Sequence, residues 1–170
     1  MQLANYYWYF QSVIPPRICD MIVHYGKSQK KKEIIGITGN QGRNRNLDTD
    51  PLTQDEIKDL KKTRDSNIVW MSDLWIYREI HPYVHRANAN AGWNFKWDWS
   101  EACQFTKYKK GQYYDWHRDG WDKPSPLEGP QKGKIRKLSM TVTLSDPSKY
   151  EGGELEFYFN RNEPGKKPKS

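Results

Sequence analysis

The feature that most constrains the fold is a change in the spacing of apolar side chains near Gly92. Before Gly92, apolar residues recur at helical spacing, whereas after it they alternate with polar residues. Side chains two residues apart project from the same face of an extended strand, so each later run has one apolar and one polar face. After a short N-terminal strand, the sequence therefore predicts helices in the first half of the chain and mainly strands in the second.

Three helices are predicted from their first residues and their apolar positions. They begin at Pro16, at Thr53 and at Leu74. Thr53-Gln-Asp-Glu56 has the capping-box pattern, so the second helix should extend to about Thr63. Ser72 or Asp73 can cap the third helix, and Pro82 predicts that this helix bends or is confined to a first turn there. These helices are expected to cover a sheet.

Five strands are predicted, and two of them have a face of distinctive composition. The predicted strands are residues 5–13, 92–99, 102–108, 135–144 and 154–159. Gln104, Thr106 and Tyr108 share one polar face, which suits the interior of a barrel that holds a charged small molecule. The aromatic face of residues 92–99 favours core packing or a substrate groove over a nucleic-acid platform, because only Lys96 interleaves with it. Residues 120–134 contain too many Pro and Gly for regular structure and predict a loop that overhangs the site.

His117 and Asp119 are the residues with the most direct chemical meaning. In an extended run they project from one face while Arg118 points away. An imidazole and a carboxylate, with a second histidine from elsewhere, form the facial ligand set of non-haem Fe(II). His81 and His85 have the spacing of a helical metal pair, but Pro82 lies between them, so we interpret both as packed helical residues. His24 is interpreted in the same way.

The motifs around this pair resemble one enzyme family. They are Tyr108-x-x-Gly111-x-x-Tyr114-x-x-His117-x-Asp119, Arg136-Lys-Leu-Ser139, Leu144-Ser-Asp-Pro147 and Tyr150-Glu-Gly-Gly-Glu-Leu155. In this order they resemble the prolyl 4-hydroxylase-like branch of the Fe(II)- and 2-oxoglutarate-dependent dioxygenases, in particular its microbial and phage hydroxylases.

The resemblance implies a fold, a reaction and a set of site residues. The fold would be α+β with a mainly β core, a double-stranded β-helix (jelly roll) supported by N-terminal helices. The reaction would be hydroxylation of a prolyl or other peptidyl residue, with Fe(II), 2-oxoglutarate and ascorbate as the reductant. His117 and Asp119 would be the metal ligands and catalytic residues, and Tyr108 would donate its hydroxyl to 2-oxoglutarate.

The chain departs from the family pattern at its C-terminal end. The family has a further histidine ligand and a Lys or Arg that pairs with 2-oxoglutarate, yet no histidine follows His117. We therefore expect a single domain truncated at the C-terminus, with residues 1–92 as the support region and residues 93–170 as an incomplete jelly roll. Candidate replacements are Glu154 or Glu156 as an oxygen donor, and Arg136 or Lys137 as the cationic anchor.

Charge and cysteine content bound the remaining alternatives. The 28 Lys and Arg exceed the 21 Asp and Glu by 7, but the excess is scattered, so nucleic acid is a possible partner that is not favoured. Two cysteines, no signal peptide and no membrane-spanning segment favour a cytoplasmic protein, in the host cytoplasm if the source is viral. A relative that oxidises a small molecule or a nucleobase, and an inactive binding module, remain alternatives.

Overall fold

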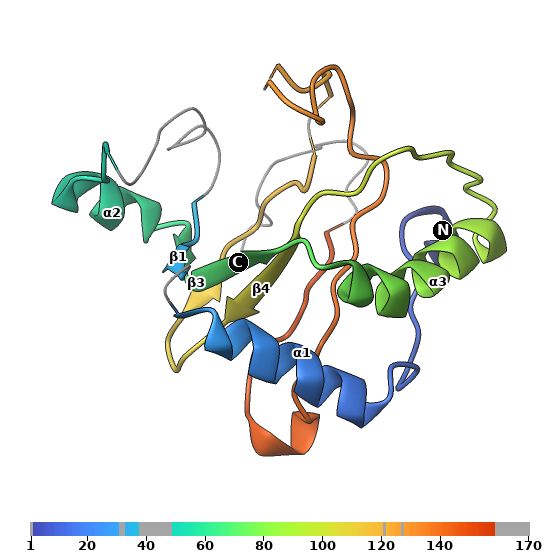
Figure 1. Cartoon of the computed structure of the whole chain (residues 1–170), viewed down its shortest axis with the longest axis horizontal. Coiled ribbons are helices and arrows are strands. Elements are labelled where there is room, and N and C mark those ends of the chain that lie inside the picture. The colour runs from blue at the N-terminus through green and yellow to red at the C-terminus, as the bar shows by residue number, and fades with distance from the viewer. Residues whose placement is uncertain (1, 31–32, 38–48, 121, 127, 159–170) are drawn as a thin grey trace.

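The structure is a computed structural model that describes residues 2–30, 33–37, 49–120, 122–126 and 128–158 (Figure 1). Its α-helices are α1 (Pro16–Ser28), α2 (Gln54–Leu60) and α3 (Leu74–Asn90). Its strands are β1 (Ile34–Ile35), β2 (Arg64–Asp65), β3 (Asn67–Met71), β4 (Cys103–Lys107) and β5 (Tyr113–Tyr114). Short 3-10 helices lie at Leu3–Asn5 and Pro147–Lys149. The described chain thus combines helices with small sheets.

The larger sheet has three antiparallel strands in the order β1-β3-β4. Val69 of β3 lies opposite Phe105 of β4, and Met71 lies opposite Cys103. This alternation sends these four side chains to one face of the sheet, where α1 and α3 cover them. Burial of this face is what holds the helices to the sheet.

The core lies between that sheet face and the two longer helices (Figure 1). Its buried members come from α1, β3 and α3, namely Ile18, Ile22, Val69, Met71 and Ile76. Leu144, far along the chain, packs against the edge of this cluster. The first half of the chain therefore supplies every fully buried member of the cluster, and the second half contributes at its edge.

The three predicted helices are confirmed, with one correction. The capping box is formed, because the Thr53 hydroxyl accepts from the Glu56 amide at 3.3 Å and the Glu56 carboxylate accepts from the Thr53 amide at 2.7 Å. The prediction that Pro82 confines the helix to a first turn is wrong, since α3 continues to Asn90. Pro82 is exposed, and the apolar face that packs on the core outweighs the one backbone hydrogen bond that proline removes.

Two predicted aromatic strands are not strands. Residues 5–13 contain no strand, and Ser12 has a φ of +52°, which interrupts an extended run. Residues 92–99 are irregular because Asn88 at the end of α3 bonds both backbone groups of Phe95, at 3.0 and 2.8 Å. Trp97 then stacks on His85 with ring centres 4.3 Å apart. Trp93 instead donates its ring N–H to the carbonyl of Ala4 at 2.8 Å, so the aromatic side chains do not form one face of a sheet.

The second half of the chain has fewer strands than its alternation predicts. The strand over residues 102–108 is confirmed as β4, whereas residues 135–144 and the described residues 154–158 have no strand assignment. In Figure 1 the chain runs from the 120–134 loop to the 3-10 helix at Pro147–Lys149 and then returns. No closed barrel is formed by the described residues. The described part also has no helix long and apolar enough to cross a membrane.

Candidate metal centre

The candidate centre begins at the small sheet of β2 and β5. Arg64 pairs with Tyr114 and Asp65 with Tyr113, in antiparallel register. The amide of Asp115 continues the pairing by donating to the carbonyl of Thr63 at 2.8 Å. The stretch 108–119 is extended only in part. It turns at Gly111, whose φ of +80° suits glycine. His117 follows β5 in irregular structure.

His117 and Asp119 face each other, as their spacing predicts. The Nε2 atom of His117 lies 3.2 Å from Oδ1 of Asp119. The Nδ1 atom lies 2.7 Å from the carbonyl oxygen of Asp115. A carbonyl oxygen can only accept, so Nδ1 carries a proton, and in the neutral ring Nε2 then presents its lone pair toward Asp119.

This arrangement requires a positive charge between the two residues. A neutral Nε2 and an ionised carboxylate are both acceptors, so they can approach closely only with a proton or a cation between them. In the metal-free protein the proton fills this role. The hydrogen bond to Asp119 raises the pKa of His117, and the hydrogen bond to His117 is the main cause that lowers the pKa of Asp119 to about 2.

The same geometry fits a metal ion. Two ligand atoms, each about 2.1 Å from an ion and at right angles to each other, lie about 3.0 Å apart. The separation of 3.2 Å between Nε2 and Oδ1 is close to that value. Imidazole and carboxylate together suit Fe(II) sites with open positions. His117 and Asp119 would therefore supply two adjacent ligands to one ion.

Asp119 is held by two residues of the 135–144 run. Ser139 donates to its Oδ2 atom at 2.5 Å, and Arg136 donates to its backbone carbonyl. Arg136 also makes two hydrogen bonds to the carboxylate of Glu101, at 2.7 and 2.6 Å. Arg136 is thus engaged by Glu101 and Asp119, which argues against the prediction that it is a free cationic anchor. Sequence reasoning did not assign a role to Ser139 or Glu101.

Tyr108 lies just beyond β4, where half of its surface is exposed. The polar face predicted on this strand is present, since the side-chain amide of Gln104 donates to the hydroxyl of Thr106 at 3.0 Å. Burial raises the pKa of Tyr114, and the nearby Asp119 and Tyr108 raise it further. Tyr108 and Asp119 therefore both act electrostatically on the phenol of Tyr114.

The described residues offer no third donor at this centre. No group of three or more His, Cys, Asp or Glu side chains in that part of the chain could hold a metal ion. Glu154 and Glu156 are exposed. His81 lies 3.2 Å from the Ser100 hydroxyl and is edge-on to His85, with ring centres 6.5 Å apart. The proposed replacement by Glu154 or Glu156 thus gains no support from the geometry.

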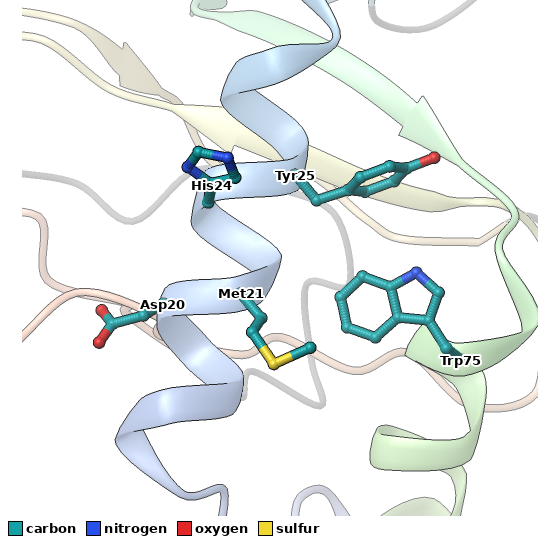
Figure 2. Close-up of a pocket in the computed structure, with 5 residues that line it drawn as sticks. All are labelled: Asp20, Met21, His24, Tyr25 and Trp75. Atoms are coloured by element: carbon teal, nitrogen blue, oxygen red, sulfur yellow. The ribbon is translucent and has the colours of Figure 1, made fainter.

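A separate hollow of about 440 Å³ lies between α1 and the start of α3 (Figure 2). Its lining residues are Asp20, Met21, His24, Tyr25 and Trp75. Tyr25 and Trp75 meet edge to face at 5.8 Å, and the Tyr25 hydroxyl donates to Asp73 at 2.9 Å. Asp73 therefore begins α3 without capping it through its side chain. His24 lies in this hollow, away from the candidate centre.

Comparison with known proteins adds one finding. A family model described as the 2OG-Fe(II) oxygenase superfamily matches residues 103–170. This match supports the assignment of the chain to that superfamily. No curated protein and no solved structure was found to match the chain. The matched range begins at β4 and includes Tyr108, His117 and Asp119. The superfamily implies an oxidoreductase that uses Fe(II) and 2-oxoglutarate.

Proposed function

We propose that this chain is an Fe(II)- and 2-oxoglutarate-dependent dioxygenase that hydroxylates a prolyl or other peptidyl residue. The observation that carries the proposal is the pair of facing acceptors, His117 Nε2 and Asp119 Oδ1, within the range that matches the oxygenase superfamily. A pair of acceptors that needs a cation between them is suited to binding metal. The jelly-roll architecture belongs to the same proposal, with β4 and β5 as two of its strands.

Each residue has a distinct part in the proposed reaction. Fe(II), when bound with 2-oxoglutarate, would supply the oxidising chemistry. His117 and Asp119 would hold the ion, and Ser139 would fix the second oxygen of Asp119 so that the first one remains directed at the metal. Tyr108 would donate its hydroxyl to a carboxylate of 2-oxoglutarate. The partly exposed Trp116, beside His117 and in edge contact with Tyr158, would form part of the wall that receives a peptide.

The reaction class is tested by measuring succinate formed from 2-oxoglutarate in the presence of Fe(II) and ascorbate. His117→Ala removes one ligand and should abolish turnover. Arg118→Ala is the matched control, because the Arg118 side chain points to Asp122, at 2.5 and 3.2 Å, and takes no part in the pair. Measurable turnover that is equal in His117→Ala and the unsubstituted chain would overturn the proposed role of His117.

The substrate class is tested with the same assay and three kinds of added substrate. Proline-containing peptides should increase succinate formation above the uncoupled rate, and mass spectrometry should find the peptide heavier by one oxygen atom. Free amino acids and single-stranded oligonucleotides are the comparison substrates. Oxygen transfer to either of these, with none to the peptides, would reject the peptidyl proposal and favour a relative that oxidises a small molecule or a nucleobase.

A further inference from the structure

Arg64 is a buried cation directly behind the candidate metal centre. It is only 2% exposed, and its Nε atom donates to the Ser66 hydroxyl at 2.8 Å. Its Nη1 atom reaches the side-chain oxygen of Gln104 at 3.4 Å, and its buried Nη2 atom has no hydrogen-bond partner among the described residues. A buried charge without a carboxylate is costly, so its place in the fold calls for a physical reason.

The Arg64 side chain is confined on one side by the backbone of Gly36. A Cβ atom added to Gly36 would lie 2.5 Å from Nε and 2.7 Å from Cζ of Arg64. Such a contact is far shorter than van der Waals separation, so the absence of a side chain at Gly36 is what makes room for the guanidinium. Because Arg64 is also buried and bonded to Ser66, it has little freedom to move away.

The other contact of the guanidinium is with the ring of Tyr114, which in turn stacks on His117. The Cζ atom of Arg64 lies 4.4 Å from the Tyr114 ring centre. The rings of Tyr114 and His117 are nearly parallel, at 7°, with centres 3.6 Å apart. One face of a phenol ring has no room for both groups at these distances, so Arg64 and His117 occupy opposite faces of Tyr114.

His117 depends on this stack because few other groups restrain it. Its side chain is 35% exposed, and its polar contacts are the carbonyl of Asp115 and the carboxylate of Asp119. Those two hydrogen bonds fix where the ring nitrogens point. The ring can still rotate about the line through the two nitrogens, and the group packed against the ring face sets that rotation. Tyr114 supplies that face, and Arg64 holds Tyr114 from behind.

We propose that Arg64 and Tyr114 are positioning residues that hold the His117 imidazole in the plane from which Nε2 faces Asp119. A series of contacts thus links the backbone of the first half of the chain to the candidate metal ligand. It runs from Gly36 through Arg64 and Tyr114 to His117. The inference rests on the proposed function for its purpose, but the stack itself is measurable in the metal-free chain.

The first test measures the proton chemical shifts of the His117 ring by NMR without metal. The stacked Tyr114 ring should shift these protons upfield. Tyr114→Leu should remove this shift, and Tyr114→Phe should retain it, because phenylalanine keeps the ring. Tyr113→Leu is the matched control, since Tyr113 neighbours Tyr114 but bonds the carbonyl of Lys61 instead. Upfield His117 protons in a folded Tyr114→Leu chain would overturn the stack.

The link to Arg64 is tested from two directions. Arg64→Met removes the cation, and Gly36→Ala places a methyl group against the guanidinium without altering any residue near His117. Both variants should move the His117 ring protons toward the values of Tyr114→Leu. If Arg64→Met fails to fold, Gly36→Ala still decides the question. Unchanged ring shifts in a folded Gly36→Ala chain would show that Arg64 does not position His117.

The last readout is the affinity for Mn(II). It is measured from the paramagnetic broadening of the Asp119 and His117 signals, a method that detects weak binding. Groups that orient metal ligands typically change affinity 10- to 100-fold, so Tyr114→Leu should bind Mn(II) about 10-fold more weakly or worse. Tyr114→Phe and Tyr113→Leu should bind as the unsubstituted chain does. If the unsubstituted chain binds no Mn(II), the proposed function fails, and the ring-shift series separately decides whether the stack positions His117.

Discussion

The two halves of the molecule differ in how they are held together. Every buried residue in the described part of the chain lies between Ile18 and Asn88, in or between the helices and strands of the first half. The two candidate ligands lie after that region, and side-chain exposure is 35% for His117 and 52% for Asp119. The first half is stabilised by apolar burial, whereas the centre is stabilised by hydrogen bonds, ion pairs and one aromatic stack.

This difference indicates that stability and chemistry are largely separable in this chain. The centre is attached to the first half of the chain by the ladder between β2 and β5 and by the Arg64–Tyr114 contact. Hydrogen bonds from Asp115 to Thr63 and from Tyr113 to Lys61 add to this attachment. Substitutions in the core should therefore lower the free energy of unfolding strongly. Substitutions at the centre should change metal binding while they change unfolding little.

The largest expected effect is on stability, from Ile22→Ala in α1. Ile22 is 4% exposed and belongs to the core cluster with Val69 and Ile76. Loss of its side chain leaves a cavity, and such substitutions lower the free energy of unfolding by about 2–5 kcal/mol. Urea denaturation measures the change. The comparison variant is Leu155→Ala, because Leu155 is 62% exposed in the second half and should cost less than about 0.5 kcal/mol. Similar costs for the two would contradict the contrast between the halves.

The next effect is that of Thr53→Ala, which removes the capping box of α2. Loss of an N-cap side chain costs about 1 kcal/mol. The hydrogen bond from the Glu56 amide to the Thr53 hydroxyl is the interaction that is lost. Thr53→Ser keeps that acceptor and is the control, with urea unfolding as the measurement. The ring shifts of His117 should not change in either variant, since α2 is absent from the core cluster and from the stack. A change in them would show that the halves are more strongly coupled than the geometry indicates.

Features governed by local sequence were the most predictable parts of the fold. The start of α2 follows from the reciprocal bonds of Thr53 and Glu56, and that of α1 from Pro16, which suits the first turn of a helix. The strands predicted at residues 92–99 and 135–144 did not form, because alternation describes an extended chain but does not supply a partner strand. The positions of residues 95 and 97 depend instead on contacts with Asn88 and His85 of α3, which the alternation of apolar residues does not reveal.

The candidate centre was predictable only where its residues are close in sequence. The spacing of His117 and Asp119 predicts a shared face, and the structure places their side chains 3.2 Å apart. Their roles as metal ligands, and that of Tyr108 toward 2-oxoglutarate, stay predictions. Arg64, Glu101 and Ser139 reach the centre through tertiary contacts, and no spacing rule relates them to His117. Arg64 in particular resembles an ordinary exposed arginine until its burial is known.

A smaller effect is expected from acid, and it concerns the centre. The pKa of Asp119 is about 2 in the folded chain, below its ordinary value of 3.8, chiefly because of the hydrogen bond to His117. Because the folded pKa is lowered, the ionised carboxylate contributes stability above pH 4, and this contribution is lost as the pH falls through about 2. The side chain is half exposed, so the contribution should be at most about 1 kcal/mol.

Asp119→Asn tests this contribution, because it removes the charge and keeps the shape of the side chain. Urea unfolding should show a stability gap between the unsubstituted chain and Asp119→Asn at pH 6 that closes as the pH approaches 2. Ser139→Ala is the control, since it removes a lesser bond to the same carboxylate and should give a smaller gap. A gap that persists at pH 2 would mean that the charge of Asp119 is not its source.

The smallest expected effect lies in the first half, at His81 of α3. Burial, and then the nearby His85, lower the pKa of His81 below its ordinary value of 6.5. A lowered folded pKa means that protonation favours the unfolded chain, so the stability present above pH 6.5 should fall as the pH decreases through the folded pKa. In His81→Gln this part of the pH dependence should disappear, as measured by urea unfolding at pH 7.5 and pH 5. Ser100→Ala, which removes the hydroxyl beside His81 but keeps the imidazole, should retain it. If His81→Gln loses as much stability between these pH values as the unsubstituted chain, the acid sensitivity of the first half comes from another group.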